Sequence, residues 1–153
     1  MIVKSLTALF IILFSAFFQM TPFLSFDLVK PNLVLLVFLA LIVLGWSLED
    51  ILPALAAAVF IFGLLHYWWF EALVMAGIVL ALFLFNKVFQ GQTILNFLLM
   101  IFLATAGFYV LTEPRSFISN LGTFGREMLL NVPLGLLFYW LGTKIKYEEI
   151  TQS

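Results

Sequence analysis

The polar residues of this chain that could do chemistry are few, and Glu127 and Asn131 form the first pair to consider. They are four residues apart, so a helix places both on one face, and the same face continues to Gly135. Pro133 lies inside that segment and would free a backbone carbonyl that needs another partner. Two interpretations stay open. One is a kinked packing helix with Glu127 at the interface beside Arg126, and the other is a polar site in a cavity or against a partner.

Asn96 and Glu71 are the next candidates. Asn96 shares a helical face with the small residues Ala104 and Gly107, which is typical of a hydrogen bond between packed helices. Glu71 follows an aromatic cluster, and its negative charge suits the first turn of a helix. The alternative for Glu71 is a carboxylate that binds a proton or a cation.

The remaining residue types argue against catalysis. His66 is the single histidine and the chain has no cysteine, so a metal site is not expected. Glu49 and Asp50 are adjacent and point to different faces of a helix, which predicts separate solvated charges rather than an acid–base pair. No glycine-rich phosphate loop, Ser/His/Asp set or HExxH motif is present. We therefore expect no enzyme, no cofactor and, without a basic run, no nucleic-acid partner.

Long uncharged blocks decide the class of protein. The chain is 65% hydrophobic, and 22 uncharged residues separate Lys4 from Asp27, while 25 separate Lys87 from Glu113. A bilayer core of roughly 30 Å needs about 20 apolar residues in a helix. Backbone groups inside lipid must be satisfied internally, and no alternating strand pattern is visible. The sequence predicts an all-α, polytopic integral membrane protein with about six transmembrane helices and membrane lipids as its surroundings.

The 153 residues are predicted to form a single transmembrane domain. Its expected helices cover residues 5–24, 31–46, 51–65, 70–85, 93–111 and 127–143. The middle could also be one spanning helix with a re-entrant piece, but the aromatic residues between its two blocks favour two helices. A short interfacial helix is possible within residues 112–126. Lys144 and Lys146 follow the last helix, which favours both termini in the cytoplasm.

Two segments carry a family resemblance. Lys30-Pro31-Asn32-Leu33 resembles the entry into the second helix of the rod shape-determining protein MreD family, where Pro-Asp/Asn-Leu-Leu is usual. The segment from Arg126 to Leu134, with Asn131 and Pro133, is similar to the last helix of that family. The chain length and the small amount of sequence outside the helices also fit.

The resemblance implies a non-enzymatic scaffold in the bacterial cytoplasmic (inner) membrane that supports cell shape and side-wall peptidoglycan synthesis. The implied partners are an MreC-like bitopic protein, a RodA-type polymerase with its transpeptidase, and an MreB-like filament of the elongasome. The family's fold also resembles the substrate-binding subunits of energy-coupling-factor transporters. A subunit that binds a vitamin-type small molecule is therefore the alternative function.

The residues expected to matter for packing or for partners are eight in number. They are Pro31, Asn32, Glu71, Asn96, Glu127, Asn131, Pro133 and Gly135.

Overall fold

Six helices account for nearly all of the described chain. The computed structural model describes residues 2–20, 31–66, 69–89, 94–114, 119 and 121–151. Its elements are α1 (Ile2–Met20), α2 (Leu33–Val43), α3 (Leu48–His66), α4 (Trp69–Phe89), α5 (Ile94–Thr112) and α6 (Leu121–Thr151). No β-strand occurs in these ranges. The prediction of an all-α chain with six helices is therefore confirmed, and so is the interpretation of residues 51–85 as two helices.

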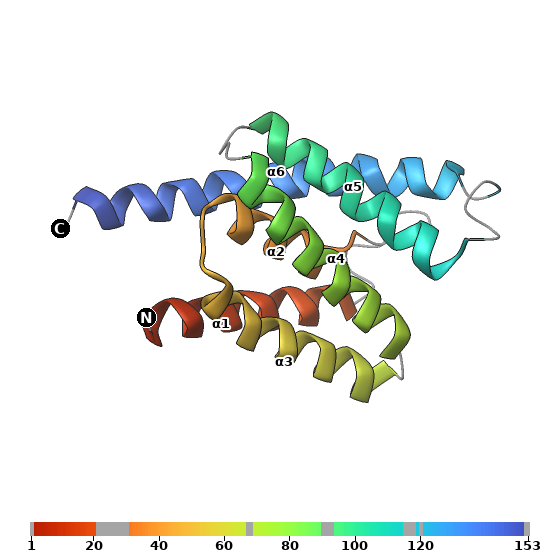
Figure 1. The fold of residues 1–153 in the computed structure, drawn as a ribbon, viewed down its shortest axis with the longest axis horizontal. Helices are drawn as coiled ribbons and strands as arrows, with labels where there is room; N and C mark the ends of the chain where they lie inside the picture. Colours follow the sequence, from red (N-terminus) through yellow and green to blue (C-terminus); the bar gives the residue numbers. More distant parts are fainter. Residues whose placement is uncertain are drawn as a thin grey trace.

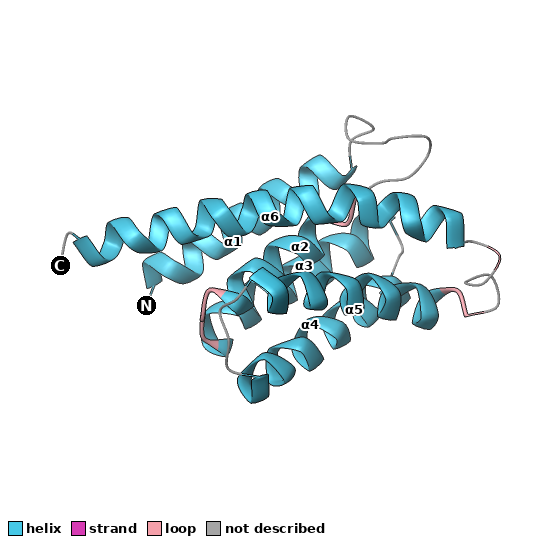
Figure 2. Ribbon diagram, turned by 90° about the horizontal axis from the view of Figure 1, so that it is seen from above, coloured by secondary structure: helices cyan, strands magenta, loops and turns pink. Residues whose placement is uncertain are grey.

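The helices run back and forth, so both chain termini lie at one end of the bundle (Figure 1). We call this the terminal end. The opposite, distal end is where α1, α3 and α5 finish and where α2, α4 and α6 begin. Figure 2 shows α6 running along the whole bundle and projecting past it at the terminal end.

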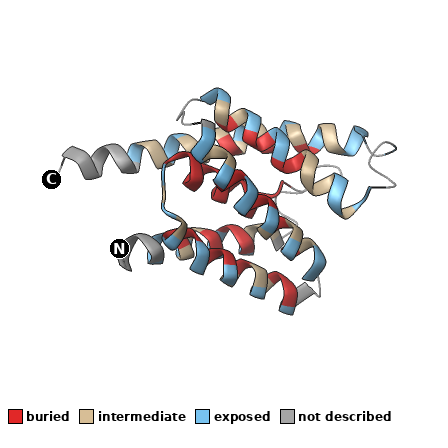
Figure 3. Ribbon diagram, viewed as in Figure 1, coloured by how far each residue is buried: buried red, intermediate tan, exposed pale blue. Residues whose placement is uncertain are grey.

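Helix α2 is the centre of the fold. It contacts each of the other five helices, and all of its residues from Leu33 to Val43 are buried. A helix that is apolar on every side either lies in a protein core or spans a membrane, and the burial of α2 on every side places it in the core. Figure 3 shows this difference, because α2 is buried throughout while the outer helices alternate between buried and exposed residues. Its 11 residues give a length of about 16 Å, so α2 reaches only part of the way through the bundle.

A local turn ends α2. Gly45 adopts a φ of 83°, a conformation that favours glycine. Its N–H donates to the carbonyl of Ile42, and the N–H of Trp46 donates to the carbonyl of Leu41, both at 3.1 Å. This pattern is a Schellman motif, which satisfies carbonyls that the helix itself cannot pair.

Several helix boundaries differ from the sequence prediction, and the largest difference is that α6 continues to Thr151 rather than ending at residue 143. Helix α2 is shorter than residues 31–46, because Asn32 and Gly45 cap its two ends. Helix α6 begins at Leu121 rather than at residue 127, so residues 121–126 of the possible interfacial helix are its first turns, where the ring of Phe124 packs edge-on against Phe102 and Tyr109 of α5. Helix α1 ends at Met20, and residues 21–24 of the predicted first helix lie outside the described residues.

Two helices are long and apolar enough to cross a membrane. They are the segments Trp69–Val88 of α4 and Ile94–Thr112 of α5, and no more than a third of the residues in either is buried inside the protein. Two further apolar helical stretches, Leu6–Gln19 and Leu33–Val43, are shorter. Several large apolar side chains on the outer helices are exposed and face outward, among them Phe10, Phe17 and Leu84.

Candidate ligand-binding site

The backbone N–H groups at the N-terminal end of α2 all donate to oxygen atoms, which come from side chains and from one nearby carbonyl. The first four N–H groups of a helix have no partner within it. Here the N–H of Asn32 donates to Oδ1 of Asn131 at 3.2 Å, and that of Leu33 donates to the Pro31 carbonyl at 3.0 Å. The N–H of Val34 donates to Oε1 of Gln19 at 3.1 Å, and that of Leu35 donates to Oδ1 of Asn32 at 3.2 Å.

Asn131 joins three helices through a single amide. Besides accepting from Asn32, its Nδ2 donates to Oγ1 of Thr105 in α5 and to Oε1 of Glu127 in α6, both at 3.2 Å. Asn131 has no exposed surface, and Glu127 is 8% exposed. The hydroxyl of Tyr109 also hydrogen-bonds the Glu127 carboxyl. Because both amide hydrogens and the amide oxygen are used, these contacts fix the orientation of the side chain.

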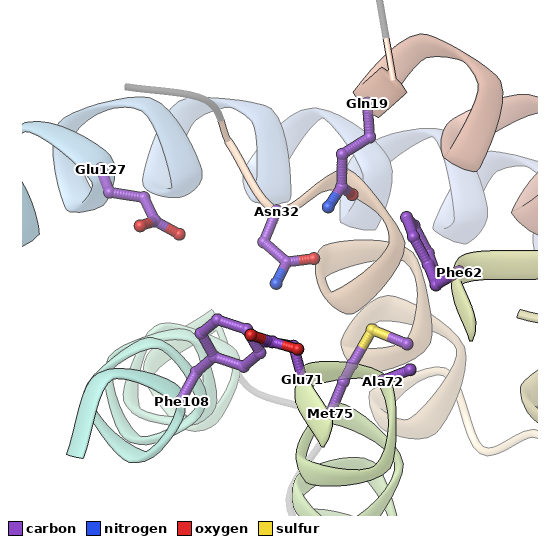
Figure 4. A pocket seen from close by; sticks show the side chains of 8 residues that line it. All are labelled: Gln19, Asn32, Phe62, Glu71, Ala72, Met75, Phe108 and Glu127. Atoms are coloured by element: carbon purple, nitrogen blue, oxygen red, sulfur yellow. The ribbon is translucent and has the colours of Figure 1, made fainter. Parts of the chain in front are cut away.

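A cavity of about 380 Å³ lies next to this network at the distal end. Figure 4 shows its eight lining side chains. They come from five helices and from the N-cap of α2, and they are Gln19, Asn32, Phe62, Glu71, Ala72, Met75, Phe108 and Glu127. The volume falls in the range of small-molecule sites, roughly 300–1,000 Å³.

The lining combines a few polar groups with apolar walls. Glu71 in the first turn of α4 and Glu127 in α6 supply two carboxylates, and the described lining holds no basic side chain. Phe62, Met75 and Phe108 supply apolar surface. Apolar walls with a few converging polar groups are the usual composition of a ligand pocket. The structure thus brings Glu71 and Glu127, two of the predicted candidates, to the same cavity, and it buries Glu127 there rather than at an exposed interface.

Pro31, Asn32 and Asn131 also belong to this end of the molecule. Pro31 is buried and provides the carbonyl for Leu33, while Asn32 is the N-cap of α2. Asn96 lies elsewhere, near the C-terminal end of α2. Its Nδ2 donates to Oδ1 of Asn86 at 2.9 Å, and Asn86 donates to the carbonyl of Ile42 at 3.1 Å.

Gly135 and Pro133 have packing roles of different kinds. Gly135 is buried, and a Cβ added to it would meet Cδ1 of Ile101 at 2.6 Å and Cδ2 of Leu36 at 3.4 Å. The absence of a side chain at Gly135 therefore allows α6 to pack closely against α2 and α5. Pro133 is exposed, and α6 continues through it as a helix. Pro133 therefore does not line the cavity.

The acidic pair at the start of α3 behaves differently from the prediction of two solvated charges. Glu49 is exposed, but Asp50 is 8% exposed. Oδ2 of Asp50 accepts a hydrogen bond from the hydroxyl of Ser47 at 2.7 Å, and the backbone N–H of Asp50 donates to that hydroxyl oxygen at 3.3 Å. Asp50 is thus part of the cap of α3, because the first turn of a helix favours acceptors and negative charge.

Sequence reasoning missed Gln19, Thr105 and Tyr109. Gln19 and Thr105 each interrupt an otherwise apolar run, which is a signal that a buried hydrogen bond is needed. Their partners, Val34 and Asn131, lie 15 and 26 residues away, so spacing along the chain does not reveal them. Among the described residues, no group of three or more His, Cys, Asp or Glu side chains could hold a metal ion.

Comparisons with protein-family models, with curated proteins and with solved structures find no match for this chain. Its function is therefore inferred from its own residues and their geometry.

Proposed function

We propose that this chain is a multi-pass protein of the bacterial cytoplasmic membrane whose six helices lie together in the bilayer. Helices α4 and α5 support this, since both are long and apolar enough to span it and face mostly outward. Helix α3 has 19 residues, which gives about 28 Å, close to a hydrocarbon thickness of about 30 Å. The short α2 needs no lipid contact, because the other helices surround it.

Both termini are placed in the cytoplasm in this proposal. Lys4, Lys87, Lys144 and Lys146 belong to the terminal end by their positions in the sequence. Nζ of Lys87 lies 4.9 Å from the ring centre of Phe83, and Nζ of Lys144 lies 5.0 Å from that of Trp140. Lysines and tryptophans at helix ends are typical of a membrane interface, and an excess of lysine and arginine favours the cytoplasmic side.

Within that membrane, the proposed role is a non-enzymatic scaffold of the cell-shape machinery, resembling MreD. The observation that carries it is the hydrogen bond between Asn131 and the N–H of Asn32, which are 99 residues apart. The two segments that resemble the MreD family therefore meet through a buried hydrogen bond. A chance likeness of two short apolar segments gives no reason for the segments to meet. The proposed partners are an MreC-like bitopic protein, a RodA-type polymerase with its transpeptidase, and an MreB-like filament.

Purification of the tagged protein in mild detergent, followed by mass spectrometry, tests this role. We expect an MreC-like bitopic protein in stoichiometric amount, and less of it with Asn131→Leu, which disconnects the two segments. Leu129→Ala is the control, because this neighbour on α6 is 76% exposed and makes no part of the network. Recovery of paired ATPases with a transmembrane coupling subunit, and no bitopic protein, would contradict the scaffold.

One observation favours a second candidate, a membrane subunit that binds a small molecule. A packing scaffold does not need the 380 Å³ cavity with two carboxylates beside the N-terminal end of α2. Such a subunit becomes more stable when its ligand is added, by RT ln(1 + [L]/Kd), whereas a scaffold without a ligand does not. Thermal unfolding with and without candidate ligands separates the two functions.

A further inference from the structure

The strongest unassigned feature is the cavity at the distal end, and its donor and acceptor groups indicate the charge of what it binds. A helix N-terminus often binds an anion through free N–H groups. This one does not offer them, since the N–H groups of residues 32–35 all have oxygen partners. The residual dipole is about half a charge, against two carboxylates in the lining. The cavity is therefore unsuited to an anion.

A divalent metal ion also fits poorly. Calcium takes six to eight oxygen ligands, and magnesium needs a near-ideal octahedron. The amide oxygens of Gln19, Asn32 and Asn131 already accept from backbone N–H groups. Only the carboxylates of Glu71 and Glu127 then stay as oxygen ligands from the side chains of the lining, too few for either ion.

Asn32 provides a separate indication of a ligand. The residue is 8% exposed, and its Oδ1 is fixed by the N–H of Leu35. Its Nδ2 has no hydrogen-bond partner among the described residues, and Figure 4 shows it directed into the open space between Glu127 and Glu71. A buried donor without a partner destabilises the fold, because it has lost its hydrogen bonds to water. A ligand with an acceptor group would remove that cost.

Glu127 retains capacity for a further donor. An ionised carboxylate offers about four acceptor positions, and Asn131 and Tyr109 use two of them. A carboxylate taken out of water is costly unless a positive charge is near it. The face of Phe108 and the thioether of Met75 complete walls that suit the carbon part of a ligand, and an aromatic face also attracts a cation.

From these contacts we propose that the cavity binds a small organic cation. Its protonated amine lies between the carboxylates of Glu71 and Glu127, its acceptor group accepts a hydrogen bond from Nδ2 of Asn32, and its apolar body lies against Phe108 and Met75. The amine belongs either to a free molecule or to the headgroup of an aminophospholipid, since the same contacts recognise both. The inference goes beyond the scaffold role and does not require it.

The test uses the purified full chain in detergent with three probes of one shape and different charge. They are 2-phenoxyethylamine, 2-phenoxyethanol and phenoxyacetate, each of which carries an ether oxygen as the acceptor group. We expect the amine alone to raise the unfolding temperature, in a saturable way. Equal or greater stabilisation by the alcohol or the acid overturns the proposal.

Three variants locate the effect. Glu71→Gln and Glu127→Gln keep the side-chain shape and an oxygen acceptor while removing one charge. Each is expected to weaken amine binding about tenfold or more, which corresponds to about 1.4 kcal/mol, because a hydrogen bond between two charged groups is lost. Glu49→Gln is the matched control, because Glu49 is exposed at the terminal end, and it should bind as the wild type does. Unchanged affinity in both cavity variants contradicts the proposed site, even if the amine binds.

The source of the amine is distinguished in lipid nanodiscs. If the headgroup of an aminophospholipid occupies the cavity, 2-phenoxyethylamine will bind more weakly in discs of phosphatidylethanolamine than in discs of phosphatidylcholine. If the natural ligand is a free amine, the two affinities will agree. Absence of amine binding in detergent and in both kinds of disc overturns the proposal. The partner purification described above is a separate experiment, so failure of the ligand site and failure of the scaffold role are distinguishable.

Discussion

The two ends of α2 satisfy their otherwise unpaired backbone groups in different ways. At its C-terminal end the chain closes on itself, through Gly45 and the Schellman bonds to Leu41 and Ile42. At its N-terminal end the partners come from α1 and α6 as well as from the local cap, and a cavity lies beside them. A local motif needs only neighbouring residues, whereas a cap built from distant side chains exists only when the other helices are in place. The stability of the fold, the packing of α6 against α2 and the proposed ligand site therefore all depend on the N-terminal end of α2.

The largest effect is expected at Asn131. Replacement by leucine removes three hydrogen bonds and leaves the N–H of Asn32 and an oxygen of Glu127 without that partner. Bonds between membrane helices average about 0.6 kcal/mol each, and unpaired buried groups cost about 1–3 kcal/mol. We expect a loss of about 2–3 kcal/mol in the free energy of unfolding, measured by denaturant or thermal unfolding in detergent. A loss no larger than that of the exposed Leu129→Ala would show that the N-terminal end does not depend on Asn131.

Gly45→Ala is expected to destabilise the C-terminal end of α2. A non-glycine residue in the left-handed region costs roughly 1–2 kcal/mol, and the φ of Gly45 is 83°. We expect destabilisation of about 1 kcal/mol with no change in amine affinity, because the cavity is at the other end of α2. Gly77→Ala serves as the comparison, since its added Cβ would meet no atom within 4 Å. Weaker amine binding in Gly45→Ala would show that the two ends are coupled through α2.

Variants of Asn32 distinguish its role as the cap of α2 from its role in binding a ligand. Asn32→Ala removes the acceptor for Leu35, and loss of such a cap typically costs about 1 kcal/mol. Asn32→Ser keeps a neutral oxygen acceptor for the cap but loses the Nδ2 donor, so we expect nearly wild-type stability and weaker binding of 2-phenoxyethylamine. Thermal unfolding with and without 2-phenoxyethylamine measures both quantities. Equal stability of the alanine and serine variants would argue against the capping role.

The smallest effect is expected at Asn96. Its hydrogen bond to Asn86 supports the bond from Asn86 to the Ile42 carbonyl, but the Schellman motif already closes that end. We expect Asn96→Ala to cost about 0.6 kcal/mol, the average for such bonds, in the same unfolding assay. A cost as large as that of Asn131→Leu would remove the difference between the two ends.

Part of the candidate site was visible in the sequence, and part was not. The spacing of Glu127, Asn131 and Gly135 was enough to place them on one helical face, and the glutamate and the amide do bond to each other. Glu71 was recognised as a first-turn residue of its helix, which the structure bears out. Nothing in the spacing indicated that Glu71 and Glu127, 56 residues apart by their numbers, line one cavity. That depends on how α4 and α6 are arranged around α2.

A helical chain with six helices follows from the sequence alone, because apolar blocks bounded by Pro, Gly and charged residues leave few other solutions. Gly45 after an apolar run is also a local stop signal, although the predicted helix continued through it to residue 46. The central, buried position of α2 and the capping of its first turn by Gln19 and Asn131 became visible only in the folded chain. The two kinds of feature differ in the sequence distance over which their interactions act. Helix formation and capping by neighbours act within about four residues, whereas a buried polar group accepts any partner that packing brings to it.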